Sequence, residues 1–336
     1  IYYHELGTPQ SQDKLAYEDP KNPLHFHSAY VPEGADYLFV ATGGAGIGDG
    51  LMYKNLKNNS GWNVIEPSQD YMVQPIGVAD GKVYILTSKG APNNRLVTID
   101  LNKPSAPWVE IVPEQKEVLT SAQFADDKLI LSYEKDAATH LYVHKLDGTK
   151  EREIALPTFG TASVSSDKGD KDVFYTFTSF VYPSAVYKYD MSTGESTLVK
   201  QAEVPGVDFS QYVTEQVFYT SKDGTKVPMF LTYKKGLEKN GKNPVYLYGY
   251  GGFNISLTPG FSANRMLWLE NGGIYAQASL RGGSEYGEAW HMAGTKLNKI
   301  NVFDDFIAAA EYMINEGWTS PDYMAIEGGS NGGLLV

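Results

Sequence analysis

A repeat of about 45 residues over the first two hundred positions most constrains the fold. Each copy has a β-rich run, a turn containing Gly or Asp, and a second alternating run, at 37–56, 82–101, 128–146 and 172–191. The copies begin 45, 46 and 44 residues apart. A period in this range, with four strands per unit, is typical of a β-propeller, whose small sheets bury their faces only against their neighbours. The regular spacing favours a propeller over the alternative, an array of β-sandwiches.

The pattern changes after about residue 203, where 204–208 reads as a linker. A hairpin over 217–233 is followed by alternating strands and helices, which predicts a parallel sheet. The predicted strands are 245–248, 274–279 and 323–326, and the predicted helices are 262–270 and 302–316. In the second helix, apolar side chains recur at helical spacing at Phe303, Phe306, Ile307, Ala310 and Met313.

We therefore predict a mixed fold. Residues 1–203 form a partial β-propeller, the end of one blade plus four blades, and residues 204–336 form part of an α/β domain. The opening segments 1–4 and 14–18 read as the last strands of an earlier blade.

Charge and composition exclude several classes of function. The chain has 28 Lys and Arg against 40 Asp and Glu, a net charge of −12, and contains no basic block, so we expect no nucleic-acid partner. No apolar run approaches the length of about 20 residues that spans a bilayer, so we expect no membrane partner. Cysteine is absent, which excludes a disulfide framework, a thiolate nucleophile and Cys-ligated zinc.

Both ends of the chain have the character of cut ends. The sequence begins at Ile1 without an initiator Met, and it stops on the apolar run 334–336 directly after a Gly-rich turn. We expect a fragment of a longer protein.

The segment 328–332 reads Gly-Gly-Ser-Asn-Gly and follows a predicted strand, the context of a nucleophile elbow. On such a sharp turn, side chains at 328 and 332 would collide with the sheet or with each other, so both positions require glycine. Ser330 would project above the sheet as the nucleophile, and the backbone N–H of Asn331 would form half of an oxyanion hole. An ordinary Gly-Ser turn is the alternative, and the preceding strands and long helix favour the elbow.

A serine nucleophile needs a histidine to take its proton and a carboxylate to orient that histidine, in the chain order Ser, acid, His. All six histidines precede Ser330: His4, His25, His27, His140, His144 and His291. His291 precedes the long helix and reads as a polar helix-entry residue. His25 and His27 share one strand face without a third ligand, so we predict no metal and no cofactor.

Several stretches closely resemble the prolyl oligopeptidase family of serine peptidases. They are 221–230, 247–256, 281–288, 303–306 and 328–335, together with the opening 3–8. The resemblance implies a seven-bladed propeller covering an α/β-hydrolase domain. On that pattern this chain holds the end of the third blade, the last four blades and the first part of the main catalytic segment. The catalytic acid and histidine would lie outside it.

The resemblance also assigns roles to individual residues. Ser330 matches the nucleophile, Asn331 matches the residue whose N–H binds the oxyanion, and Tyr250 matches the tyrosine whose hydroxyl is the second donor. Phe253 matches an aromatic residue of the substrate pocket. Phe26 aligns, with gaps, near an apolar propeller residue that faces the substrate.

Two further positions bear on the resemblance. Some family members carry an arginine on the substrate face of the propeller where this chain reads Thr-Gly-Gly-Ala-Gly-Ile-Gly at 42–48, so we do not carry over a clamp for a substrate carboxylate. Arg281 lies in a Gly-rich loop after a strand, and we interpret it as a structural anchor.

The resemblance implies a serine endopeptidase that hydrolyses short peptides on the carboxyl side of proline through an acyl-enzyme. We expect residues 1–336 alone to be inactive, and the complete enzyme to be a monomer in the cytoplasm, or alternatively in the periplasm. Two other functions remain open. One is a related oligopeptidase or dipeptidyl peptidase of the same architecture, and the other is a non-catalytic propeller that serves as an interaction module.

Overall fold

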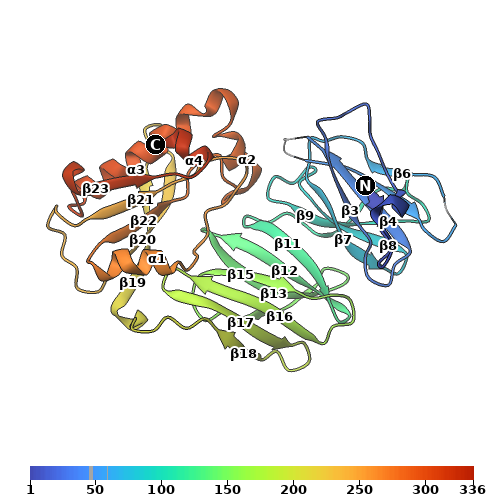
Figure 1. The fold of residues 1–336 in the computed structure, drawn as a ribbon, viewed down its shortest axis with the longest axis horizontal. Helices are drawn as coiled ribbons and strands as arrows, with labels where there is room; N and C mark the ends of the chain where they lie inside the picture. The colour runs from blue at the N-terminus through green and yellow to red at the C-terminus, as the bar shows by residue number, and fades with distance from the viewer. Residues whose placement is uncertain (45–47, 59) are drawn as a thin grey trace.

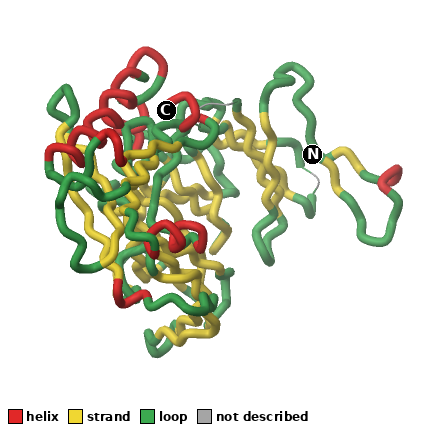
Figure 2. The backbone as a smooth tube through the Cα atoms, turned by 60° about the vertical axis from the view of Figure 1, so that its left-hand side comes forward, coloured by secondary structure: helices red, strands yellow, loops and turns green. Residues whose placement is uncertain are grey.

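The computed structural model describes residues 1–44, 48–58 and 60–336. Within them, four antiparallel sheets of four strands lie beside one five-stranded sheet with its helices (Figure 1). A small hairpin precedes the first sheet, formed by β1 (Tyr2–Tyr3) and β2 (Lys14–Leu15), and Figure 2 shows it projecting from the rest of the molecule. This arrangement confirms the predicted fold class.

The strands of the four sheets follow one another in chain order. The first sheet contains β3 (Phe26–Tyr30), β4 (Tyr37–Gly43), β5 (Gly50–Asn55) and β6 (Asn63–Glu66). The second contains β7 (Val73–Ala79), β8 (Lys82–Thr87), β9 (Arg95–Asp100) and β10 (Val109–Val112). The third contains β11 (Val118–Ala125), β12 (Lys128–Lys135), β13 (Ala138–Lys145) and β14 (Lys150–Ile154). The fourth contains β15 (Thr161–Ser165), β16 (Asp172–Ser179), β17 (Tyr182–Asp190) and β18 (Ser196–Gln201). The repeated segments of the sequence are therefore the second and third strands of each sheet.

Each sheet is stabilised by packing against the next one. In β16 burial alternates along the strand, and Val173, Tyr175 and Phe177 point inward. They share one hydrophobic cluster with Ile130 and Val143 of the preceding sheet. Because the cluster joins two sheets, neither could bury its face alone.

The five-stranded sheet has the order β19-β20-β22-β21-β23. Its strands are β19 (Tyr212–Thr220), β20 (Lys226–Lys234), β21 (Val245–Tyr248), β22 (Ile274–Ala278) and β23 (Met324–Glu327). Strands β22, β21 and β23 are parallel, as predicted, whereas β20 pairs with β22 in antiparallel fashion, so the sheet is mixed. The antiparallel part arises because β19 and β20 form a hairpin whose second strand joins the parallel strands.

The helices of this part are α1 (Ala263–Glu270), α2 (Gly287–Met292), α3 (Ile300–Asn315) and α4 (Asn331–Leu335). Short 3-10 turns occur at Gln10–Gln12, Phe209–Gln211, Lys296–Asn298 and Pro321–Tyr323. The sequence did not predict α2, which starts with a glycine at positive φ and has only six residues. Among the described residues, no helix is long and apolar enough to cross a bilayer.

The buried face of α3 does not coincide with the apolar residues that recur at helical spacing in the sequence. Val302, Phe306, Ala309 and Met313 are buried, whereas Ile307 is 55% exposed. The buried residues recur at intervals of three and four, which places Ile307 off the stripe that faces the sheet.

The predicted domain boundary between 203 and 204 falls in the connection between β18 and β19. The boundary itself stays a prediction. Residues before it and residues after it are in contact with each other. Phe180, in the turn between β16 and β17, packs with Phe230, Met266 and Tyr275 of the mixed sheet and α1 in a single cluster.

Two buried carboxyl groups, one from each part of the chain, lie near enough to interact electrostatically. Glu285 and Glu134 are only 2% and 7% exposed, and one oxygen of each has no hydrogen-bond partner among the described residues. Burial, with the nearby Glu134 charge adding to it, raises the pKa of Glu285 to about 8. Burial likewise raises the pKa of Glu134 to about 7. The contact therefore favours neutral carboxyl groups.

This burial predicts a pH-dependent stability. A carboxyl group whose pKa rises on folding contributes its full stability below its unfolded pKa, and that contribution is lost as pH rises from 4.5 to about 8. Across this pH range, we expect the free energy of unfolding of Glu285→Gln to decrease less than that of the parent. Urea denaturation at about pH 5 and about pH 8 measures the difference. Glu203→Gln, at an exposed position before β19, is the matched control, and equal slopes for parent and Glu285→Gln would contradict the prediction.

Candidate active site

The site is formed where two neighbouring parallel strands end. Tyr248, the last residue of β21, is directly opposite Glu327, the last residue of β23. The loops that follow therefore emerge side by side at the carboxyl edge of the sheet. Tyr250 lies two residues beyond the end of β21, and Ser330 lies three residues beyond the end of β23.

Ser330 occupies a strained backbone conformation. Its φ is 53° and its ψ is −112°, outside the usual regions for an L-residue. Such a conformation costs about 1–3 kcal/mol and persists only where surrounding contacts impose it. Two backbone hydrogen bonds close the turn, from the Gly332 N–H to the Gly329 carbonyl at 2.7 Å and from the Gly333 N–H to the Ser330 carbonyl at 2.8 Å. The serine is exposed, directly before α4.

The glycines at either end of this turn are required by close contacts. A Cβ at Gly328 would lie 2.0 Å from the carbonyl oxygen of Gly332, and a Cβ at Gly332 would lie 2.8 Å from the carbonyl oxygen of Gly249. The first contact is within the turn, and the second is with the end of β21. Both agree with the crowding expected from the sequence.

Asn331 joins the serine turn to the Tyr250 loop. Its side-chain Nδ2 donates to the Tyr250 carbonyl at 2.6 Å. A Cβ at Gly252 would lie 2.6 Å from this Nδ2, so glycine leaves the room that the amide occupies. The structure thus brings Ser330, Asn331 and Tyr250 together.

The two phenylalanines are in different places. Phe253 lies in the same loop as Tyr250, has a φ of 57° and is 69% exposed at this edge of the sheet. Phe26 begins β3 in the first sheet and is 73% exposed. Phe26 belongs to the sheet farthest along the molecule from β23 in Figure 1. The unusual segment 42–48 lies at the end of β4, and its residues 45–47 are outside the described ones.

Arg281, which follows β22, connects the end of this strand to two other elements. It is buried, and its guanidinium lies 2.6 Å from Asp305 of α3 and 2.5 Å from Asp223 of the β19–β20 turn. The hydrogen bond from Arg281 lowers the pKa of Asp223 to about 2. These contacts agree with the structural anchor expected at Arg281. The sequence did not reveal Asp305 as the partner, although it lies in the family-like stretch 303–306.

His291 is buried in α2 instead of standing at a helix entry. Its Nδ1 lies 2.8 Å from the Gly282 carbonyl oxygen and 3.1 Å from the Asn254 backbone nitrogen. The ring therefore supports the loop that carries Phe253. In the hydrogen bonds of the described residues, Ser330 has no histidine partner.

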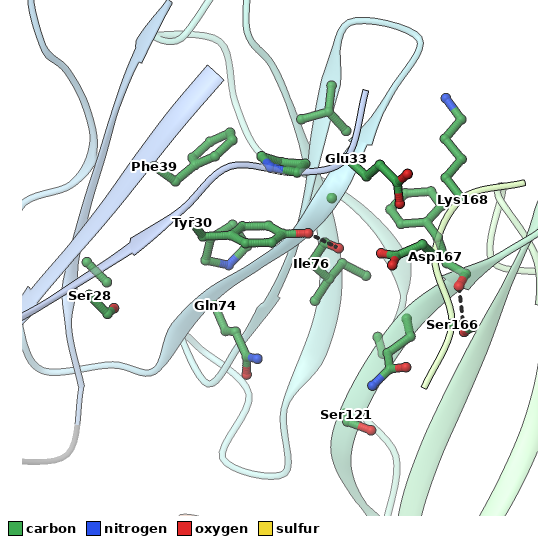
Figure 3. Close-up of a pocket in the computed structure, with 18 of the residues that line it drawn as sticks. Ser28, Tyr30, Glu33, Phe39, Gln74, Ile76, Ser121, Ser166, Asp167 and Lys168 are labelled. Atoms are coloured by element: carbon green, nitrogen blue, oxygen red, sulfur yellow. Dashed lines mark hydrogen bonds between the residues drawn. The ribbon is translucent and has the colours of Figure 1, made fainter. Parts of the chain in front are cut away.

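A large cavity lies elsewhere, among the first strands of the four propeller sheets. It has a volume of about 660 Å³. Figure 3 shows Tyr30, Gln74, Ser121, Glu33, Asp167 and Lys168 around it. The Tyr30 hydroxyl donates to the Ile76 carbonyl at 3.2 Å, which joins the first and second sheets. Its walls contain none of the residues at the β21 and β23 ends, so it is separate from the serine site.

Two family models match the chain. Residues 1–202 match "Prolyl oligopeptidase, N-terminal beta-propeller domain", and residues 259–336 match "Prolyl oligopeptidase family".

Individual relatives are similar over the whole chain. Prolyl endopeptidase of Elizabethkingia meningoseptica is 45% identical over 340 residues, which cover 100% of this chain and 48% of that protein. A solved structure from a study of two prolyl endopeptidases is 41% identical, with a TM-score of 0.95, and the match covers 99% of this chain and 49% of that one. Prolyl oligopeptidase B of Galerina marginata, bound to a 25mer macrocyclization substrate, is 31% identical with a TM-score of 0.95, over 100% of this chain and 48% of that one. This chain spans about half the length of the curated relatives it matches.

The glycine contacts predict a sharp difference between two adjacent positions. Gly328→Ala places a methyl group against the Gly332 carbonyl, so we expect it to lower the free energy of unfolding by about 1–3 kcal/mol. Gly329→Ala is the matched control, because a Cβ there meets nothing within 4 Å. Urea denaturation of both variants measures the difference. Equal stability of the two variants would show that the turn does not have this geometry.

Proposed function

The chain belongs to the prolyl oligopeptidase family, and we propose that it supplies the nucleophile and oxyanion site of a serine endopeptidase. The proposed substrates are short peptides, cleaved on the carboxyl side of proline. The observation that carries the proposal is the strained backbone of Ser330 at the carboxyl end of β23, beside the loop of Tyr250. Strain of this kind is retained at functional sites because it aims a side chain.

In the proposed reaction, Ser330 Oγ attacks the carbonyl carbon of the scissile bond while a histidine takes the hydroxyl proton. The negative charge that develops on the carbonyl oxygen is bound by the Asn331 N–H and the Tyr250 hydroxyl. The histidine then protonates the leaving amine, and water hydrolyses the acyl-enzyme by the reverse sequence of proton transfers. The histidine and its acid partner come from outside residues 1–336.

The proposed preference for proline is supported by the relatives that are named prolyl endopeptidases. Phe253 is the proposed aromatic wall of the substrate pocket, since it extends from the Tyr250 loop. Phe26 is the proposed apolar contact from the propeller. In this proposal, residues 1–203 supply the propeller surface and residues 204–336 supply the chemistry. The complete enzyme is proposed to be a monomer in the cytoplasm or the periplasm.

A related oligopeptidase with another specificity is the main alternative, and the identity of 45% to a prolyl endopeptidase favours the prolyl branch. A non-catalytic propeller module is disfavoured, because such a protein would have no need of the strain at Ser330.

A chimera tests the nucleophile. Residues 1–336 replace the matching half of the Elizabethkingia meningoseptica relative, and we expect the product to react with a fluorophosphonate probe and to hydrolyse a chromogenic proline peptide. Ser330→Ala removes the attacking atom, so we expect both signals to disappear, with a loss in kcat of about 10⁶. Residues 1–336 alone should show no turnover.

Circular dichroism and the melting temperature establish that the chimera and its variant are folded. Labelling of folded Ser330→Ala, or turnover by residues 1–336 alone at the rate of the chimera, would overturn the proposal.

A second prediction concerns the oxyanion site. Tyr250→Phe removes one hydroxyl donor, so we expect kcat in the chimera to fall by about 10²–10³ with little change in KM. Tyr246→Phe is the control, because Tyr246 packs against Trp268 and Tyr275 within the domain. A change confined to KM would assign Tyr250 to substrate binding instead.

A further inference from the structure

Lys299 extends from the start of α3 to the serine site. Its ammonium donates to the Gly251 carbonyl at 2.7 Å and to the Asn331 Oδ1 at 3.3 Å. Gly251 directly follows Tyr250, and Asn331 directly follows Ser330. The lysine therefore contacts the neighbours of both residues on which the proposed reaction depends.

The contacts of Lys299 complete those of the Asn331 amide. Asn331 Nδ2 donates to the Tyr250 carbonyl at 2.6 Å, and Oδ1 accepts from Lys299. With one atom bound to the Tyr250 loop and the other to the lysine, this side chain has a fixed orientation. The close approach of Gly252 also limits its movement.

The environment of Lys299 is unusual for a lysine. Partial burial lowers its pKa, which means that its charge is held at a cost. None of the ion pairs between described residues includes Lys299, so no carboxylate offsets this cost. Both of its hydrogen-bond partners are neutral oxygens, and both lie in the two loops of the serine site. Its hydrogen bonds therefore connect these two loops to each other.

We propose that Lys299 is a positioning residue that fixes the Asn331 N–H and the Tyr250 hydroxyl relative to each other. It acts by holding the Asn331 side chain and the Gly251 carbonyl together, so that the serine turn and the Tyr250 loop move as one unit. A fixed pair of donors binds an oxyanion more strongly than two donors that must be ordered during the reaction. This inference rests on the proposed serine peptidase function.

The test uses the same chimera, whose own turnover must first be established. Lys299→Met removes the ammonium and keeps the length of the side chain. We expect kcat to fall about tenfold, the size expected for a hydrogen bond from a charged group, with KM changed less than about twofold. Lys296→Met, at an exposed lysine three residues earlier, is the matched control and should retain the parent's kcat.

A double-variant comparison separates positioning from a general loss of structure. Asn331→Ala removes the side chain but keeps the backbone N–H. If Lys299 acts through Asn331, the double variant should lose no more in kcat than the more damaging single variant. Losses that multiply, or an unchanged kcat in Lys299→Met, would overturn the inference.

A loss of stability in Lys299→Met is distinguished from a loss of positioning by a second substitution. If Lys299→Met lowers the melting temperature, Lys299→Gln, which keeps a donor, serves as the second variant. A loss of kcat that follows the folded fraction in both variants would assign Lys299 a merely structural role and reject the proposal. A chimera without turnover, in contrast, would count against the proposed function itself.

Discussion

The buried ion pair between Arg281 and Asp305 is the interaction on which the serine site depends. It fixes the end of β22 to α3, and the second contact of Arg281, with Asp223, adds the β19–β20 turn. Asp305 is fully buried, and leaving one partner of such a pair alone typically costs about 3–5 kcal/mol. The loop after Arg281 is therefore fixed in space, and the Gly282 carbonyl accepts from the Asn254 N–H at 3.1 Å. Through this bond the anchor reaches the loop that carries Phe253 and Tyr250.

The strained backbone of Ser330 also has to be held in place by contacts with other parts of the chain. The glycines at 328 and 332 permit the turn, but permission alone does not impose the conformation. Contacts with other elements impose this backbone conformation. The Asn331 amide is bound to the Tyr250 carbonyl, and Lys299 contacts both loops. The cost of the serine conformation is thus offset by hydrogen bonds between the loops that follow β21 and β23, and these same bonds determine where the proposed oxyanion donors lie.

The sequence predicted the parts of this structure that local pattern determines. The 45-residue spacing identified the second and third strands of each propeller sheet, and Gly328 and Gly332 identified a crowded turn. It did not predict the partners that only the folded chain brings together. Asp305 and Lys299 are 24 and 32 residues from the groups they bind, and nothing in their immediate neighbours distinguishes them from surface charges. The apolar residues of α3 also do not identify by themselves the side that faces the sheet, because a stripe of small and large apolar residues permits more than one orientation and Ile307 is exposed.

The propeller takes part in the site through the loop that Arg281 begins. Tyr286 of this loop contacts the third propeller sheet, because its hydroxyl donates to Asp136 at 3.1 Å. The buried carboxyl group of Glu285 interacts electrostatically with Glu134 of the same sheet. The Glu288 N–H donates to the Pro92 carbonyl of the second sheet at 3.1 Å. A displacement of either sheet would therefore act on a segment only a few residues from Arg281 and Gly282. Since Gly282 holds the Phe253 loop, the geometry of the proposed oxyanion site depends on how the propeller packs against this loop.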